Sequence, residues 1–129
     1  MRAIADLSRA EIGALKRVGF WRSDEKPELP HPADFVDAAW RVFEGERVLL
    51  YLEEAYGLPY FPLGWSWCRL GCPGIPNDIG TKDLTDGAYL FPEGLAHYVR
   101  LHAVRPPTEF LEHLRANNYH VPKLRTLSL

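Results

Sequence analysis

The chain has 129 residues, of which 47% are hydrophobic and 25% are charged. This balance is typical of a globular protein and excludes a disordered or fibrous chain. A formal net charge of −2 excludes the overall positive charge by which many proteins attract nucleic acid. At this length we expect one domain over residues 1–129, with a helical part at 1–57 and a part containing loops, a hairpin and C-terminal helices at 58–129.

The sequence favours a cytoplasmic location. The first residues carry no apolar core of the kind found in signal peptides, and no stretch reaches the roughly 18 apolar residues that a membrane span requires. We therefore expect neither export nor membrane insertion. In a reducing compartment Cys68 and Cys72, which are the only cysteines, are expected to be free thiols or metal ligands rather than a disulfide.

Helical periodicity dominates residues 1–57. Ser8 and Glu11 have the spacing of a capping box, which predicts a helix from there to about Val18, ended by Gly19. A second helix is predicted from Pro32 onwards and should end at Gly45, and a third should cover residues 48–56. Because residues 48–52 form a short apolar run, a strand remains an alternative there. The second helix is expected to bury the apolar stripe Phe35, Val36, Ala39, Trp40 and Phe43.

Residues 58–129 are interrupted more often. Aromatic residues, glycine and proline dominate residues 58–80, where we expect little regular structure. Asp86-Gly87 predicts a two-residue type I′ turn between strands at 82–85 and 88–91. A helix is expected at 95–103, followed by a last helix that Thr108 caps. Together these elements predict a small, mostly helical α+β domain with one short antiparallel hairpin.

Four residues of this second part have the chemistry of metal ligands. Cys68 and Cys72 are separated by three residues, and His97 and His102 follow on one predicted helix. The order resembles that of a C2H2 zinc finger, in which two thiolates and two imidazoles fill the tetrahedral shell of zinc. A structural zinc would stabilise a loop-rich region, because the free energy of metal binding becomes folding free energy. The predicted metal site is therefore Cys68, Cys72, His97 and His102.

One geometric feature opposes the metal site. On a regular helix His97 and His102 lie about 140° apart around the axis, so the last turn must distort before both can reach one metal.

Two alternatives to the metal site use the same residues. Without a metal, the cysteines would be small buried hydrophobes, with His97 in the core and His102 exposed. In an enzyme, Cys68 or Cys72 would be a thiolate activated by one of these histidines. The orienting carboxylate would then be Asp83 or Asp86, whereas His113 and His120 are expected to face solvent.

One resemblance covers about a third of the chain. Its residues are Ser66-Trp-Cys-Arg69, Leu84-Thr-Asp-Gly87, Phe91-Pro-Glu-Gly-Leu-Ala-His-Tyr-Val99 and Val104-Arg-Pro-Pro-Thr-Glu-Phe110. These stretches resemble a segment shared by bacterial proteins of unknown function, which carry a Cys-x2-Cys pair. Here the cysteines are one residue further apart, which bears on the metal geometry. The resemblance implies a metal site and no particular activity.

These features together predict a non-catalytic protein-binding or regulatory module with a structural zinc. The runner-up is a small enzyme that uses Cys68 or Cys72, His97 and Asp83. We expect the partner to be another protein, docking near an aromatic group of Tyr60, Phe61, Trp65 and Trp67. Nucleic acid is an unlikely partner, because residues 96–129 are only mildly basic.

Overall fold

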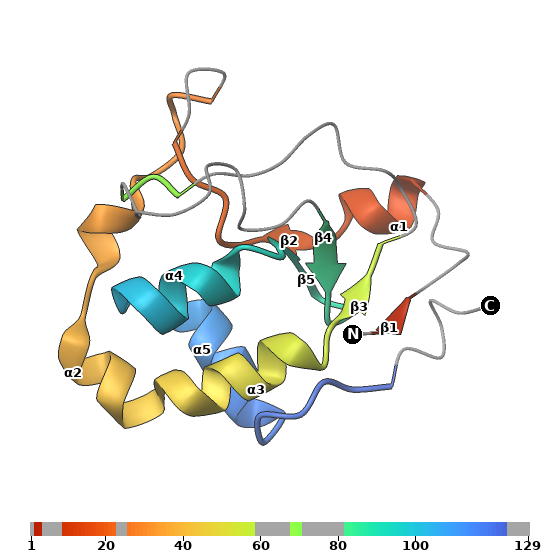
Figure 1. The fold of residues 1–129 in the computed structure, drawn as a ribbon. Helices are drawn as coiled ribbons and strands as arrows, with labels where there is room; N and C mark the ends of the chain where they lie inside the picture. Colours follow the sequence, from red (N-terminus) through yellow and green to blue (C-terminus); the bar gives the residue numbers. More distant parts are fainter. Residues whose placement is uncertain (1, 4–8, 23–25, 59–67, 71–81, 124–129) are drawn as a thin grey trace.

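The computed structural model describes residues 2–3, 9–22, 26–58, 68–70 and 82–123. Its architecture is α+β and mostly helical, which confirms the predicted fold class. Figure 1 shows the longer helices grouped together beside one small sheet. The strands are β1 (Arg2–Ala3), β2 (Lys16–Arg17), β3 (Tyr56–Gly57), β4 (Asp83–Thr85) and β5 (Tyr89–Pro92). The helical elements are α1 (Arg9–Gly13), η1 (Pro32–Phe35), α2 (Ala38–Trp40), η2 (Arg41–Gly45), α3 (Glu46–Glu53), α4 (Leu95–His102) and α5 (Thr108–Ala116).

The sheet has five strands in the order β1-β3-β4-β5-β2. β4 pairs antiparallel with both β3 and β5, whereas β1 pairs with β3 and β2 pairs with β5 in parallel. The part predicted to be helical, residues 1–57, therefore contributes β1, β2 and β3 to the sheet. Such short strands do not stand out by hydrophobic periodicity, which is why the sequence indicated only two of the five.

The first helix is shorter than its periodicity predicts. α1 ends at Gly13, and the chain enters β2 at Lys16 instead of continuing to Val18. The amides of Lys16 and Val18 donate to the carbonyls of Ala88 and Leu90 at 3.0 and 2.9 Å, so pairing with β5 replaces helical hydrogen bonds. Gly19 has the expected positive φ of 79°, yet it follows a strand and not a helix.

The predicted break at Gly45 is also absent. α2, η2 and α3 follow one another without interruption from Ala38 to Glu53, and Asp37 caps the start by accepting from the Trp40 amide at 2.9 Å. η2 is a π-helical turn, which inserts an extra residue and rotates the apolar stripe away from the core. Phe43, predicted to be buried, is consequently 68% exposed. Val36, also predicted to be buried, lies before this helix and is 52% exposed. Residues 46–53 are helical, which excludes the alternative strand.

The turn between β4 and β5 differs from the predicted type I′ turn. Only Gly87 has a positive φ in residues 86–88, whereas type I′ requires it at both central positions. Side chains hold the turn instead. Asp86 Oδ1 accepts from the amides of Ala88 and Tyr89 at 2.9 and 2.8 Å, and Thr85 Oγ1 accepts from the Gly87 amide at 3.0 Å.

The last two helices follow their predicted ranges closely, except that Thr108 is the first residue of α5 and Pro107 occupies the cap position. Both helices bury one apolar face against α3 and the sheet. Residues with no measurable exposure mark this core: Val48, Tyr51, Ala55, Phe91, Val99, Val104, Phe110, Leu111 and Leu114. In the described part of the chain, no helix combines the length and the apolar content needed to cross a membrane.

Candidate metal centre

α4 carries both candidate histidines. Leu95, Tyr98 and Val99 form its buried face, which fixes the helix against the core. His97 and His102 are half-buried residues of the same helix. His102 is the last residue of the helix, and Ala103 follows in the left-handed conformation with a φ of 52°.

A short segment at residues 68–70 brings the third candidate to this helix. The Arg69 amide donates to the hydroxyl of Tyr98 at 2.9 Å, and Arg69 Nε donates to the Arg22 carbonyl at 3.4 Å. The first bond ties the segment to α4, and the second ties it to the chain after β2. Cys68, which is half-buried and packs on the hydrophobic core, is thereby placed facing the two imidazoles.

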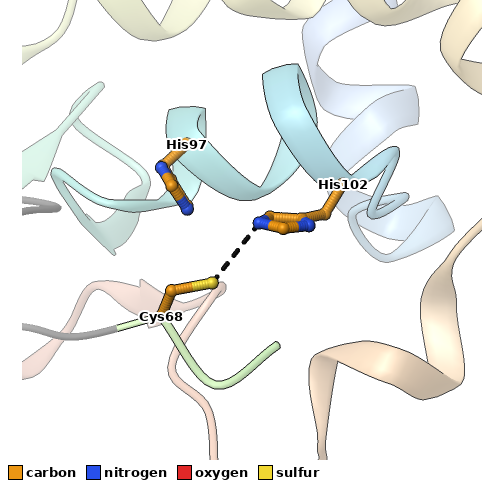
Figure 2. A group of neighbouring side chains, drawn as sticks. All are labelled: Cys68, His97 and His102. Atoms are coloured by element: carbon orange, nitrogen blue, oxygen red, sulfur yellow. Dashed lines mark hydrogen bonds between the residues drawn. The ribbon is translucent and has the colours of Figure 1, made fainter. Parts of the chain in front are cut away.

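The three side chains converge on one point, as Figure 2 shows. Cys68 Sγ lies 3.4 Å from His102 Nε2, and one ligand atom from each residue lies within 4.8 Å of the others. Zinc at about 2.3 Å from sulfur and about 2.0–2.1 Å from nitrogen holds neighbouring tetrahedral ligands about 3.3–3.6 Å apart. The group is therefore close to a coordination shell and could hold a metal ion after small side-chain movements.

The predicted obstacle of a 140° separation does not arise. The ring centroids of His97 and His102 are 5.1 Å apart, although the residues are five positions apart on the helix. The alternative with His97 in the core and His102 exposed is wrong as well, because both are half-buried and adjacent. Side-chain length and the helix end at His102 supply the reach that the backbone positions alone do not.

His97 is suited to bind a cation. Burial lowers the pKa of His97 below its ordinary value, and the neighbouring His102 and Arg100 lower it further. Its ring is therefore neutral at pH 7, which is the form that coordinates metals. Within the described residues, its buried Nε2 atom has no hydrogen-bond partner. An unsatisfied buried nitrogen is costly, and a metal ion would satisfy it.

The other predicted site residues either lie outside the described residues or are not part of this group. Cys72 lies outside the described residues, as do Tyr60, Phe61, Trp65 and Trp67 of the predicted docking patch. Asp83 is half-buried in β4 and is not part of the group. Asp86 is engaged elsewhere, so neither carboxylate proposed for an enzyme orients His97 or His102.

Asp86 belongs to a second polar cluster that the sequence did not indicate. Its Oδ2 atom accepts from the Tyr51 hydroxyl at 2.5 Å and lies 2.9 Å from His113 Nε2. His113, predicted to face solvent, is instead half-buried in this cluster. Burial, followed by the negative charge of Asp86, raises the pKa of Tyr51, which keeps the hydroxyl protonated as a donor.

A third cluster surrounds Glu44, whose side chain is fully buried in η2. Arg115 donates to both carboxylate oxygens at 2.6 and 2.8 Å, and the Tyr119 hydroxyl and Trp40 Nε1 donate at 2.6 and 2.9 Å. Burial would raise the pKa of Glu44, but these donated hydrogen bonds outweigh burial and lower it to about 2. Because Glu44 and Arg115 are far apart in sequence, only an internal acidic residue on an otherwise apolar helical face could have indicated the cluster.

Comparison of the chain with models of known protein families, with curated proteins and with solved structures finds no match. The likeness to bacterial proteins with a Cys-x2-Cys pair thus stays a prediction. The function must be argued from the site itself.

Proposed function

We propose that this protein is a zinc-binding, non-catalytic protein-binding module of the cytoplasm. Cys68, His97 and His102 supply one thiolate and two imidazoles, a donor set that suits zinc. Cys72 is the candidate fourth ligand that would close the shell. The observation that carries the proposal is the convergence of three ligand atoms within 4.8 Å.

The proposed role of zinc is structural. The segment at residues 68–70 is tied to α4 by hydrogen bonds from one residue, Arg69, to Tyr98 and by the contact of Cys68 with His102. A metal bound to Cys68 and both histidines would add a covalent-like link between this segment and the helix. At a free zinc concentration a thousandfold above the dissociation constant, binding would stabilise the fold by about 4 kcal/mol.

The metal test is elemental analysis of the untagged protein, prepared without chelator. We expect about one zinc ion per chain in the parent and a loss of zinc in Cys68→Ser and His97→Leu. His120→Gln is the matched control, because His120 is an exposed histidine on the C-terminal segment. Parent protein that stays metal-free after incubation with zinc would refute the metal-binding part of the proposal.

The role of Cys72 is tested separately. A closed four-ligand shell predicts that Cys72→Ser binds zinc far more weakly than the parent, and that the bound metal has no exchangeable water. Unchanged affinity in this variant would exclude Cys72 as a ligand. The site would then have three protein ligands and an open position, as in catalytic zinc sites.

Exposed apolar side chains support the protein-binding part. Val42 and Phe43 on η2 are 88% and 68% exposed, and Leu50 on α3 is 60% exposed. Large exposed apolar residues that lie together on a surface mark interaction sites. The test is quantitative co-purification from the native host with the parent and with a Val42→Ser/Phe43→Ser variant. We expect partners to be lost from the variant while its zinc content is retained, and equal recovery would contradict the assignment.

The enzyme alternative is favoured by one distance. Cys68 Sγ lies 3.4 Å from His102 Nε2, which is the contact a thiolate–imidazole nucleophile requires. The pairing involves His102 and not His97, and Asp83 is outside the group. Alkylation of Cys68 by iodoacetamide at pH 6 distinguishes the enzyme from the zinc-binding module. A thiolate activated by histidine reacts quickly at that pH, whereas a zinc-bound or ordinary thiol does not.

A further inference from the structure

A second concave site lies on a different part of the molecule. It is a pocket of about 670 Å³ between the segment that leaves β2, the loop at residues 26–30, and the residues Phe35 and Pro107. This volume is within the range of small-molecule sites, about 300–1,000 Å³. Figure 1 shows two orange segments, one running outward from β2 and one running back toward α2. Residues of both segments, at 17–21 and 26–30, line the pocket. Cys68, His97 and His102 do not line it.

The wall of the pocket is aromatic and aliphatic. Trp21 forms its centre, being only 7% exposed, and its ring packs on Phe35 and Tyr98 with centroids 5.9 and 5.7 Å apart. Gly19 makes this wall continuous with the core, because its positive φ turns the chain where an added Cβ would lie 3.0 Å from Leu95 Cδ1. The surface is therefore preformed and suited to an apolar group. The remaining apolar lining residues are Val18, Phe20, Leu29, Pro30 and Pro107.

Charged residues occur among the exposed lining residues. Among the described residues that line the pocket, Arg17 and Lys26 are cations and Glu28 is a carboxylate. The Arg17 guanidinium lies 5.2 Å from the Phe20 ring centre, and this stacking holds the cation beside the apolar wall. The Arg17 guanidinium is therefore placed to meet an anionic group on the ligand.

We propose that this pocket binds an aromatic or branched aliphatic group that carries a carboxylate, with the ring against Trp21 and Phe35 and the carboxylate at Arg17. Two sources offer this chemistry: a free aromatic acid and the C-terminal residue of a peptide. The site is independent of the proposed zinc, so either proposal can fail without the other.

The test uses 4-fluorophenylacetate as the probe and 4-fluorophenylacetamide as its neutral match, observed by fluorine NMR with the whole protein. We expect the acid to bind at least about tenfold more tightly than the amide, since the charge-assisted bond is lost in the amide. Arg17→Gln should reduce acid binding by about tenfold and leave the amide unchanged. Arg47→Gln, an exposed arginine on α3 that does not line the pocket, should change neither.

The two sources are separated by a short peptide that ends in 4-fluorophenylalanine, as its free acid and as its amide. Tighter binding of the peptide acid than of the small acid identifies a peptide terminus as the ligand, and the reverse order identifies a free acid. Leu29→Trp, which fills the pocket, should abolish binding of every probe while zinc content is unchanged. Absence of binding by both acids, or equal binding of acid and amide in the parent, would overturn the proposal. The same titration with Cys68→Ser is expected to match the parent.

Discussion

His113 and His97 are both half-buried histidines on amphipathic helices, yet their surroundings differ. His113 Nε2 lies 2.9 Å from Asp86 Oδ2 and 3.4 Å from Asn117 Nδ2, and Asp86 also accepts from Tyr51 and two backbone amides. His97 Nε2 is buried without a partner, beside a thiol and a second imidazole. A closed hydrogen-bond network, in which every group has a partner, stabilises the fold. A group of metal-ligand side chains with an unsatisfied nitrogen indicates instead a site for a bound metal ion.

The cluster around Glu44 extends this comparison, because it is also closed. Every donor that faces its carboxylate, from Trp40, Arg115 and Tyr119, has its acceptor there. Loss of one side chain from a closed cluster should lower the free energy of unfolding. Loss of one side chain from the metal-free candidate metal centre should not. Three predictions test this difference.

The largest effect is expected for Glu44→Ala. Removing the carboxylate leaves the Trp40 and Tyr119 donors without an acceptor, at about 1–3 kcal/mol for each buried donor. It also ends the ion pair with Arg115, whose side chain is 39% exposed and can be hydrated. Urea denaturation measures the loss. Glu46→Ala is the control, because this carboxylate is 78% exposed and pairs with Arg41 on the surface, where ion pairs contribute about 0–1 kcal/mol. Equal losses in the two variants would contradict the closed character of the cluster.

Acid should act through the same residue. Because the pKa of Glu44 is lowered from 4.5 in the unfolded chain to about 2 in the fold, the stabilisation is complete above pH 4.5 and is lost as the pH falls toward 2. The difference corresponds to about 3 kcal/mol at neutral pH. The free energy of unfolding measured between pH 7 and pH 2 should fall more steeply in the parent than in Glu44→Gln. If the free energy of unfolding fell equally in the two proteins, residues other than Glu44 would cause the acid sensitivity.

The smallest effects separate the two histidines directly. In metal-free protein, His113→Leu should cost about 1–3 kcal/mol, since Asp86 then loses a polar neighbour. His97→Leu should cost less than about 1 kcal/mol or stabilise the fold, because it removes a buried nitrogen that has no partner. Thermal unfolding in the presence of a chelator compares the two variants. A larger loss from His97→Leu would mean that His97 has a structural role of its own.

The sequence predicted some elements well, and particular residues show why. The helices at Leu95–His102 and Thr108–Ala116 follow from local signals, namely Pro92, the pair Pro106-Pro107 and a clear apolar stripe. Lys16 and Arg17 were predicted as helix, because local periodicity does not register that the Lys16 amide donates to Ala88 and the Val18 amide to Leu90. Helix was predicted at Arg41–Gly45, but its π form and its continuation into α3 were missed, because a π insertion leaves no pattern in composition.

The candidate site also has residues that the sequence predicted, whereas other polar residues were placed wrongly. Cys68, His97 and His102 were named from residue type and order, and the structure brings them together. The spacing on α4 predicted an obstacle that the side chains overcome. His113 was assigned to solvent because its partner, Asp86, is 27 positions away, at a separation where sequence spacing carries no information about contact.

By itself the sequence determined the fold class, the two C-terminal helices and the ligand types that could serve a metal, because these depend on residue chemistry and short-range periodicity. The tertiary structure alone decided which short segments became strands and which polar residues found hydrogen-bond partners. It also decided that a pocket with an aromatic wall lies between residues 17–21 and 26–30. These features arise when distant backbone and side-chain groups compete for the same hydrogen-bond partners and the same buried volume, and that competition has no signature in local sequence.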